Sequence, residues 1–511
     1  MQIWGACMFD LIIKNGLIID GSGSEGYVSD IGIMDGSITK ISRNLTNARS
    51  IIDASGLVVT PGFIDSHSHA DKNLLLFPEQ REKLEQGITT SVAGQCGGSA
   101  APVKSKNAEE ALGSMRGFIS AVRATSLGAN IVPFVGHGTI RKYVMGDSDR
   151  KADSNDLSQM CELLKQSFEA GAGGLSFGLF YAPGCFASTE EAVAMAKVAA
   201  QFNRPVSAHI RNESDTLIEA VEEFVEIIRQ SKARGILSHH KAVRKRNWGK
   251  VEKTLQILRK AVEEGVDIYC DLYPYCASST VLSQALVPFS WRANGTSELL
   301  TRIADPELFA NNKAAFLKTN GPNLDWILIN SCPGYPQYEG MTIDQIAPIH
   351  GKDQFDTAMD LVVLSRDKAT ACFFTVSEDD LKHVVTWNRT MICTDSGMAN
   401  VNKRVHPRMI GSFPHAIAHF VKEQNVVSLS EMIRRMTSLP ASVYDLKGKG
   451  LIKEGFDADL CIFDPDVINN RSDFIQCRQK TEGLNYVLVS GCVVVENGLF
   501  NGTKCAQILT K

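Results

Sequence analysis

Apolar and polar positions alternate in short runs at both ends of the chain, which is typical of β-strands. Residues 1–62 contain the stretches "FDLIIKNGLIIDGSG", "SDIGIMDGSITKIS" and "SIIDASGLVVTPG", in which Asn-Gly and Asp-Gly pairs are hairpin signals. Residues 445–511 repeat this texture in "GLIKEGFDADLCIFDPDV" and "YVLVSGCVVVENGLFNG". Two matching β segments around a different middle predict one small β-sandwich built from both termini.

The middle of the chain, residues 63–444, alternates strand-like and helix-like segments. Stretches such as 188–203 and 216–235 carry apolar residues at helical spacing behind a Ser or Thr cap. Eight strand candidates lie in the segments "GFIDSHSH", "GITTSVAGQC", "NIVPFVGH", "GGLSFGL", "RPVSAHI", "GILSHH", "VDIYCDLYPY" and "TMICTDSG". Eight strands alternating with helices predict an α/β fold, a TIM-like (β/α)8 barrel, whose functional residues lie at the carboxyl ends of the strands.

The connection between the seventh and eighth predicted strands is far longer than the others. It covers residues 276–390, whereas most connections in compact domains have about 2–8 residues. We expect an insertion here that forms a lid or substrate domain. The predicted organisation is therefore a terminal β domain from 1–62 and 445–511, and a barrel over 63–444 that carries the insertion.

Composition and charge exclude several classes of function. With 44% apolar and 22% charged residues, the 511-residue chain has the material for a folded core. A formal charge of −4 gives no basic field for nucleic acid or acidic membranes, and we interpret the basic run 243–250 as a solvated loop. No basic leader is present, and no window reaches the roughly 18 apolar residues of a membrane span. We expect a soluble, cytoplasmic protein without nucleic-acid or membrane partners.

Thirteen cysteines without regular spacing fit reduced thiols better than a disulfide framework. Most of them are expected to be small core residues.

Residues that can bind metals or titrate follow most of the predicted strands. His67 and His69 end the first strand, and the period of two points both side chains to the same side. The ends of later strands carry, in chain order, Cys96, His137, His209, the pair His239–His240, and Asp395. Only the fourth and seventh strands lack such a residue. Each residue alone has a structural explanation, but their coincidence at strand ends indicates a metal site.

Several motifs resemble those of the N-acyl-D-amino-acid deacylases, or D-aminoacylases, of the amidohydrolase superfamily. They are "PGFIDSHSHAD", "AGQCG", "GLSFGLFYAPG", "AHIRNE", "SHHK", "DLYPYCASST", "TDSG" and "HPRMIGSFPHAI". The terminal "GLIKEGFDADLCIFDP" also resembles the β domain of that superfamily, so the resemblance covers nearly the whole chain. The H-x-H motif alone marks only the superfamily, and the Cys96 motif narrows the resemblance considerably.

The resemblance implies a zinc site of defined composition. Many binuclear members use a carbamylated lysine at the fourth strand, but the segment "GGLSFGLFY" contains no lysine. A thiolate suits zinc, and one Cys with two His leaves the fourth zinc position open for water. The resemblance implies a tight zinc site formed by Cys96, His209 and His239. It also implies a second, weaker site formed by His67, His69 and Asp395.

Two further histidines have other interpretations. His240 follows His239 directly and must point to the opposite side of the strand, so we expect it to be packed and hydrogen-bonded outside the barrel. The choice of His239 as the ligand comes from the family pattern. His137 can orient a ligand or substrate, or cap its own loop.

The resemblance also implies a reaction. Asp395 takes a proton from the zinc-activated water and later delivers it to the leaving nitrogen. Tyr181 and Tyr273 are candidates for stabilising the oxyanion. Arg408 matches the arginine that binds the substrate carboxylate, and its fork gives bidentate recognition. Further substrate contacts are expected from Lys241, Tyr181, Tyr273, Ser279 and Phe180. The chain departs from the family pattern at Gln95, where we expect Asn, and throughout the insertion.

Three functional hypotheses follow. The leading one is zinc-dependent cleavage of linear N-acyl-D-amino acids, with D-stereospecificity implied by the resemblance alone. A cyclic amidase of the hydantoinase or dihydroorotase type shares the barrel and H-x-H, but the missing lysine and Arg408 argue against it. A non-catalytic scaffold with the same fold would be expected to lose ligands, and this sequence retains all six.

Overall fold

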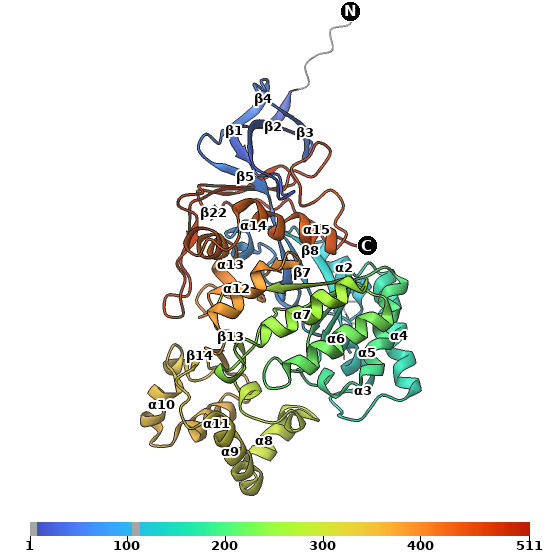
Figure 1. Cartoon of the computed structure of the whole chain (residues 1–511), viewed down its shortest axis with the longest axis vertical. Helices are drawn as coiled ribbons and strands as arrows, with labels where there is room; N and C mark the ends of the chain where they lie inside the picture. Colours follow the sequence, from blue (N-terminus) through green and yellow to red (C-terminus); the bar gives the residue numbers. More distant parts are fainter. Residues whose placement is uncertain (1–7, 105–112) are drawn as a thin grey trace, which may run out of the picture.

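The computed structural model describes residues 8–104 and 113–511. A β domain lies at one end of the molecule, the barrel lies in the middle, and a helical insertion lies at the other end (Figure 1). The predicted domain bounds of 1–62, 63–444, 276–390 and 445–511 stay predictions. Residues 1–7 of the first range lie outside the described residues.

The predicted barrel is confirmed. Within the described residues its sheet has eight parallel strands, which neighbour one another in chain order. They are β6 (Phe63–Ser68), β7 (Ile88–Ala93), β8 (Asn130–Gly136), β9 (Gly174–Gly178), β10 (Val206–His209), β11 (Gly235–Leu237), β12 (Ile268–Leu272) and β16 (Thr390–Ile392). Each lies inside one of the eight predicted segments. A parallel bridge between Ser68 and Ser396 brings β16 back to β6 and nearly closes the barrel.

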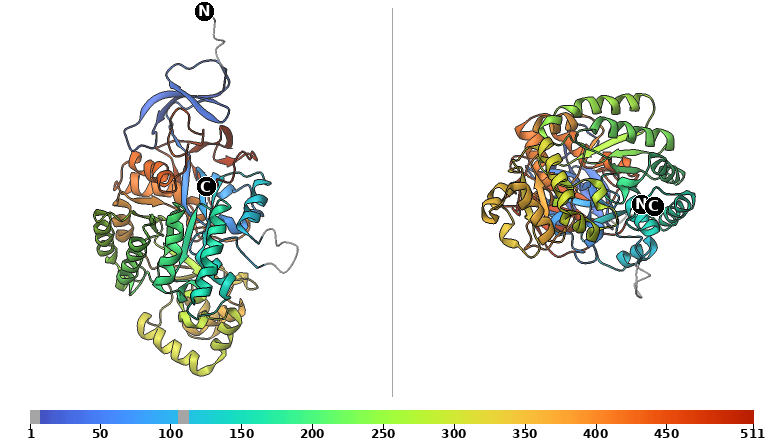
Figure 2. Two further views of the ribbon diagram at one scale, coloured as in Figure 1. Left: turned by 90° about the vertical axis from the view of Figure 1, so that its right-hand side faces the viewer. Right: turned by 90° about the horizontal axis from the view of Figure 1, so that it is seen from below.

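Helices surround the strands, as the end-on view in Figure 2 shows. They are α1 (Arg81–Leu84), α2 (Met115–Arg123), α3 (His137–Met145), α4 (Ser154–Glu169), α5 (Thr189–Gln201), α6 (Leu217–Ser231), α7 (Lys250–Glu263), α12 (Glu378–Thr386), α13 (Arg408–Ala416), a π-helix (Ile417–Glu423), α14 (Leu429–Met436) and α15 (Ser438–Val443). The expected cap of α5 is confirmed, because the Ser188 hydroxyl accepts a hydrogen bond from the Glu191 amide. Thr216 precedes α6 but its side chain makes no capping bond.

The insertion has its own core. It contains β13 (Ser278–Val281), α8 (Thr296–Ala304), α9 (Pro306–Asn320), β14 (Ile327–Ser331), α10 (Ile343–His350), α11 (Gln354–Leu364) and β15 (Thr370–Phe373). The three strands pair antiparallel in the order β13, β15, β14, and the helices bury apolar side chains against them. The next helix, α12, packs against α7, β12 and β16, and so covers the barrel.

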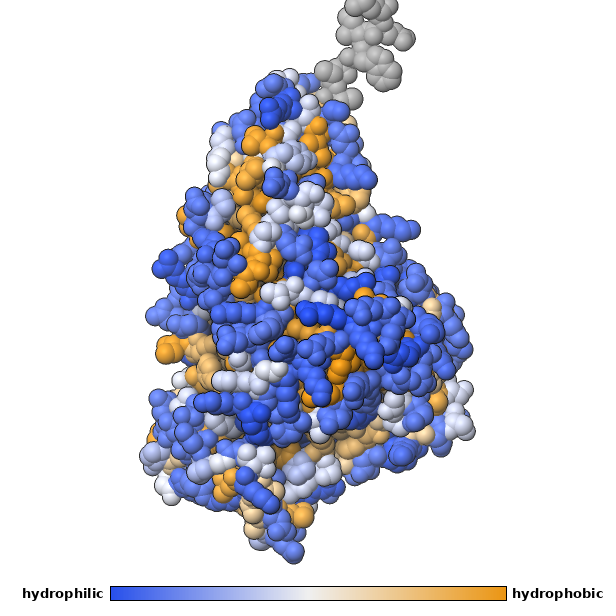
Figure 3. Space-filling view, viewed as in Figure 1, coloured by the Kyte–Doolittle hydropathy of each residue, from blue (hydrophilic) through white to orange (hydrophobic). Residues whose placement is uncertain are grey.

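Strands from both termini form the β domain, as the sequence predicts. Its described strands are β1 (Phe9–Ile18), β2 (Tyr27–Met34), β3 (Ser37–Ser42), β4 (Ala48–Asp53), β5 (Val58–Pro61), β17 (Leu460–Phe463), β20 (Leu484–Val489), β21 (Cys492–Glu496) and β22 (Leu499–Phe500). Hydrogen bonds join them into one mixed sheet around a shared apolar core. The antiparallel pairing of β5 with β17 connects the two terminal segments. Apolar side chains also gather on the outer surface of this domain (Figure 3).

The hairpin signals in this domain had different outcomes. Asp35-Gly36 lies between the antiparallel strands β2 and β3, and both residues have positive φ, 50° and 75°. This is the backbone conformation that such two-residue turns require. Asn15-Gly16 does not form a hairpin, and that prediction was wrong. It lies inside β1, where the pairing with β2 shifts register, so it forms a bulge.

The expectation of reduced thiols was wrong for one pair, because Cys492 and Cys505 form a disulfide. The other ten cysteines of the described chain are free. Among the described residues, no helix combines the length and the apolar character needed to cross a bilayer.

A fully buried lysine holds the seam where the barrel closes. The Lys83 ammonium, on α1, donates to Asp65 Oδ2 at 2.8 Å, Thr394 Oγ1 at 2.7 Å and the Ser396 carbonyl at 3.0 Å. All three of its protons are therefore used. Asp65 lies on β6, whereas Thr394 and Ser396 follow β16. This side chain therefore ties the first strand of the barrel to the last.

We expect Lys83→Met to lower the free energy of unfolding by about 3–5 kcal/mol, because it leaves the Asp65 carboxylate buried and unpaired. Denaturant unfolding followed by tryptophan fluorescence measures this change. As a matched control, Lys142→Met breaks the exposed pair with Asp147 and should change stability by less than about 1 kcal/mol. Similar small effects of both variants would show that Lys83 does not hold the seam.

Candidate metal centre

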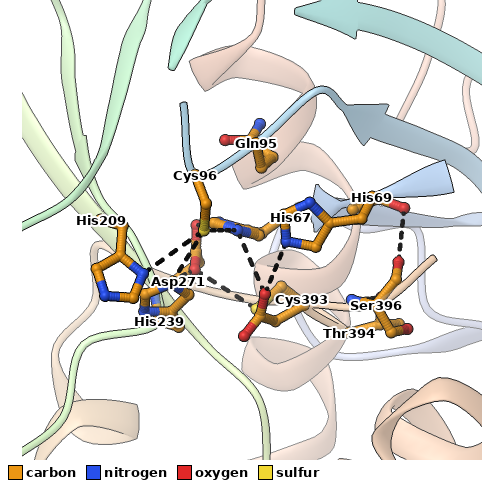
Figure 4. Close-up of polar contacts among 12 residues, drawn as sticks. His67, His69, Gln95, Cys96, His209, His239, Asp271, Cys393, Thr394 and Ser396 are labelled. Carbon is orange, nitrogen blue, oxygen red and sulfur yellow. Dashed lines mark hydrogen bonds and ion pairs between the residues drawn. The ribbon is translucent and has the colours of Figure 1, made fainter. Parts of the chain in front are cut away.

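Five of the six predicted metal ligands meet at the carboxyl ends of five barrel strands, and the sixth lies beside them. His67 lies on β6, Cys96 follows β7, His209 ends β10, His239 follows β11 and Asp395 follows β16. The side chains of His67, His209 and His239 converge around the Cys96 sulfur in Figure 4. The Cys96 Sγ lies 3.2 Å from His67 Nε2, 3.4 Å from His239 Nε2 and 3.7 Å from His209 Nδ1. The sequence therefore predicted which distant residues would come together.

His69 adjoins this cluster through Asp395. His69 Nε2 lies 3.1 Å from Asp395 Oδ1, and His67 Nε2 lies 3.5 Å from the same oxygen. The ligand atoms of His67, Cys96, His239 and Asp395 all lie within 4.8 Å of one another. A soft sulfur, imidazole nitrogens and a carboxylate at this spacing form a donor set that suits zinc.

Three of these residues have backbone conformations that non-glycine residues rarely adopt. The φ angles are 53° at Cys96, 37° at His239 and 44° at Asp395. Each such residue costs about 1–3 kcal/mol and persists only where the surroundings enforce it. The Asp395 amide donates to the His67 carbonyl at 2.9 Å, and the His239 amide donates to Asp271 Oδ1 at 2.6 Å. These bonds hold the strained turns that aim the side chains inward.

The pKa directions also fit a cation site. Burial lowers the pKa of His209 and of His239 well below the usual value, and the charge of Lys241 adds to the effect at His239. Both rings are therefore neutral and keep a lone pair for a metal. At His67, burial acts in the same direction, but the negative charges of Cys96 and Asp271 raise the pKa well above its usual value. Negative charge that attracts a proton to this ring also favours a metal cation.

Two acidic residues beside the ligands were missed by the sequence reasoning. Glu213 Oε1 lies 2.9 Å from His239 Nδ1, and its other oxygen lies 3.9 Å from His209 Nε2. Asp271, on β12, lies 3.6 Å from His67 Nδ1. Carboxylates that bind the second nitrogen of a ligand histidine fix its orientation. The i,i+4 spacing of Glu213 from His209 could have indicated from the sequence that the two residues lie close together. No such spacing relates Asp271 to His67.

The structure also places the histidines whose role was open. His240 is buried and its Nε2 lies 2.9 Å from Thr254 Oγ1 on α7, which is the packed position expected for it. His137 is buried at the start of α3, and its Nε2 lies 2.7 Å from Glu191 Oε1. It therefore lies in a buried ion-pair network with Glu191 and Arg141 instead of reaching the cluster.

Gly178, at the end of β9, has no room for a side chain. A Cβ atom built on Gly178 would lie 2.1 Å from the Cys96 carbonyl oxygen. The loop that presents Cys96 thus packs directly against the backbone of β9. This close contact excludes a side chain, and so a lysine, at Gly178.

A cavity of about 330 Å³ opens next to the cluster. His209, His239 and Asp395 form part of its wall. The six residues predicted to contact substrate also line it: Phe180, Tyr181, Lys241, Tyr273, Ser279 and Arg408. A second cavity of about 400 Å³ shares Tyr181, Asp395 and Arg408 and extends toward His69 and Cys96. The structure thus places every predicted site residue except the fully buried His67 in the walls of two adjoining cavities.

Positive groups in the first cavity are held in place. Arg408 NH1 lies 2.7 Å from Asp395 Oδ2, and the guanidinium carbon lies 4.6 Å from the centre of the Tyr273 ring. Lys241 Nζ donates to Glu213 Oε1 at 2.7 Å. The Tyr273 hydroxyl is buried without a hydrogen-bond partner in the described part of the chain. Its unused donor can bind an oxygen atom of a ligand.

Comparisons with known proteins agree with this geometry. An amidohydrolase family model matches residues 50–305 and 394–495. The D-aminoacylase of Alcaligenes xylosoxydans xylosoxydans is 31% identical, over 98% of both chains. The chain belongs to the D-aminoacylase family of the amidohydrolase superfamily. The N-acyl-D-glutamate deacylase of the same organism is also 31% identical, over 95% of this chain and 93% of the relative.

A solved structure also supports the assignment of this protein to the D-aminoacylase family. N-acyl-D-glutamate deacylase from Bordetella bronchiseptica, in complex with zinc and a phosphonate inhibitor, is 32% identical. The TM-score is 0.85, and the match covers 99% of this chain and 100% of that one. Family membership and the His/Cys/Asp cluster together indicate a metal-dependent amidohydrolase.

We expect Cys96→Ala and His209→Ala each to lose most of the zinc that the wild-type protein retains through gel filtration, because each removes one donor of a small set. Elemental analysis by mass spectrometry measures zinc per chain. Cys161→Ala, which removes a half-buried thiol that contacts Met195, is the matched control and should keep the zinc. A Cys96→Ala protein with full zinc content would show that the sulfur is not a ligand.

Proposed function

We propose that this protein is a zinc-dependent hydrolase that cleaves N-acyl-D-amino acids to a carboxylic acid and a free D-amino acid. The observation that carries the proposal is the Cys/His/Asp cluster at the wall of a cavity that also contains Arg408. A cluster of this kind suits a metal that activates water, and the arginine suits a substrate carboxylate. The two relatives that match 98% and 95% of this chain are named for this kind of activity, which supports the proposal further.

The proposed tight zinc ligands are Cys96, His209 and His239, and the proposed weaker site uses His67, His69 and Asp395. The neutral imidazoles and the surrounding negative charge fit a dication. Zinc, when bound, acts as a Lewis acid that lowers the pKa of water and polarises the amide carbonyl. Burial raises the pKa of the Cys96 thiol, so it needs a cation nearby to act as a thiolate.

Asp395 is the proposed general base and general acid. Burial alone would raise its pKa, but the charge of Arg408 and the hydrogen bond with His69 hold it well below its usual value. The group is therefore a carboxylate at neutral pH and can accept a proton from water. The same carboxyl then delivers this proton to the leaving nitrogen, so one group serves both half-reactions.

Arg408 is the proposed anchor for the substrate carboxylate. Its second nitrogen, NH2, lies 3.3 Å from the Ser279 carbonyl, which keeps the guanidinium turned toward the cavity. Lys241 and Tyr273 line this cavity and do not line the second one. We therefore place the amino-acid half of the substrate in the 330 Å³ cavity and direct its acyl half toward the second cavity. Tyr273, with its unused hydroxyl, is the proposed donor to the developing oxyanion.

The other two hypotheses receive less support. A cyclic amidase that uses a carbamylated lysine at the fourth strand is disfavoured, because the segment "GGLSFGLFY" contains no lysine and the Cys96 loop leaves no room for a side chain at Gly178. A non-catalytic scaffold does not require a cluster of intact ligands or an aspartate paired with a cavity arginine.

Hydrolysis of N-acetyl-D-methionine, N-acetyl-L-methionine and a 5-substituted hydantoin separates the three hypotheses. We expect the zinc-loaded protein to hydrolyse the D-isomer and neither of the others. Asp395→Ala should retain the tightly bound zinc and lose about 10²–10⁴-fold in kcat, because it removes the proton shuttle. Turnover of the hydantoin alone, or of no N-acyl-D-amino acid, would reject the proposal.

We expect Arg408→Ala to raise KM for N-acetyl-D-methionine roughly 10- to 100-fold, because it removes charge-assisted hydrogen bonds to the carboxylate. Arg408→Lys is the matched control, since it preserves the charge beside Asp395 and loses the bidentate fork. Relative to Arg408→Ala, the Arg408→Lys variant should restore kcat more completely than it restores KM. An unchanged KM in Arg408→Ala would assign Arg408 to an ion pair alone.

A further inference from the structure

The charges that line the 330 Å³ cavity are not balanced. Four cationic side chains and three carboxylates lie in its wall, among the residues that the structure describes. Three of the cations each have a carboxylate at 2.7 Å: Lys241 with Glu213, Arg246 with Asp215, and Arg408 with Asp395. The fourth is Arg244, which pairs with no carboxylate of the described chain. Its positive charge is therefore free to meet a ligand.

Arg244 adopts a backbone conformation that favours glycine. It follows β11 with a φ of 76° and a ψ of 132°, and a non-glycine residue in such a region costs about 1–3 kcal/mol. Its amide donates to the Thr375 carbonyl at 2.8 Å, next to the exit of the insertion. A long cationic side chain at a strained position faces the cavity. Strain of this kind often marks a functional site.

The guanidinium is held in place without using its donors. Its central carbon lies 3.8 Å from the centre of the Trp326 ring, which belongs to the insertion. The Trp326 indole is fixed in turn, because its Nε1 donates to the Asn323 carbonyl at 2.9 Å. No acceptor from the described residues bonds to the Arg244 side chain. Burial, with the charge of Arg246, lowers its pKa to about 10, so it is still cationic at neutral pH.

Part of the cavity wall is apolar. Phe180, Phe316, Trp326 and Phe373 line the same cavity. A ligand group that suits this wall has an apolar stem, and a group that suits Arg244 has an anionic end. A stacked guanidinium presents its planar fork to a carboxylate and can bind it with two hydrogen bonds.

We propose that Arg244 is a specificity-determining residue that binds a carboxylate at the end of the substrate's amino-acid side chain. The inference rests on the proposed function, and it narrows the substrate class to N-acyl derivatives of amino dicarboxylic acids. Arg408 binds the carboxylate next to the amide nitrogen, and Arg244 binds the distal one. The anion then occupies the one position in the described cavity wall where a cation lacks a partner.

The test compares N-acetyl-D-glutamate with its neutral isostere N-acetyl-D-glutamine and with N-acetyl-D-methionine. For the zinc-loaded wild-type protein we expect kcat/KM to be roughly 10- to 100-fold higher for the glutamate derivative than for the glutamine derivative. Arg244→Met should remove this preference, with a loss of the same size on the acidic substrate. The two neutral substrates should change less than about threefold, since they make no charged contact.

Two further variants separate specificity from folding. Arg244→Gly relieves the positive φ, so it should lose the preference while the melting temperature stays equal or rises. Arg246→Gln removes a cation of the same wall that is already paired with Asp215, so it should affect acidic and neutral substrates equally.

The inference fails if the wild-type protein cleaves the glutamine or methionine derivative as well as the glutamate derivative. It also fails if Arg244→Met lowers kcat/KM equally for all three substrates. In both cases the proposed function stands, because hydrolysis of N-acyl-D-amino acids has been observed. A wild-type protein that cleaves none of the three rejects the proposed function itself, and this inference with it.

Discussion

The cost of burying ionisable groups is the constraint on which this structure depends. A thiol, several imidazoles and a carboxylate lie out of water at the barrel mouth, and an unpaired group there would cost several kcal/mol. The surrounding residues offset this cost: Arg408 pairs with Asp395, Glu213 with His239, and Asp271 with the remaining nitrogen of His67. The negative charge that remains around the histidine rings is the charge that a bound metal cation would balance.

The same constraint explains the backbone at the strand ends. Side chains of a regular strand alternate between its two faces. A chain that continued in this way past the strand end would not turn the ligand side chains toward one point. The left-handed turns at Cys96, His239 and Asp395 redirect each chain just beyond its strand. The strain is tolerated because the amides at two of these turns donate to buried acceptors. The turn at His239 leaves His240 outside, where Thr254 satisfies it.

Local periodicity carried much of the prediction. Apolar runs that end in polar residues located all eight described barrel strands, and the period of two placed His67 on the inward face. Glu213, Asp271 and Lys83 depend on partners that the fold brings close, and Lys83 meets Thr394 across 311 positions of sequence. Nothing near Lys83 in the sequence indicates that contact. The hairpin predicted at Asn15-Gly16 was wrong for a related reason. An Asn-Gly pair fits a bulge as well as a hairpin, and pairing with the neighbouring strand decides which of the two forms.

The cavity wall and the metal centre belong to different cores. The cluster rests on the barrel, whereas Phe316 and Phe373 belong to the separate apolar core of the insertion and reach the cavity from there. Substitutions within that core can reshape the wall proposed to face the amino-acid side chain of the substrate while the strand ends keep their positions. Arg244 lies at the junction, with its backbone on the barrel side and its guanidinium stacked on Trp326 of the insertion. Under the proposed function, substrate choice depends on how the two units meet, whereas the proposed metal ligands all come from the barrel.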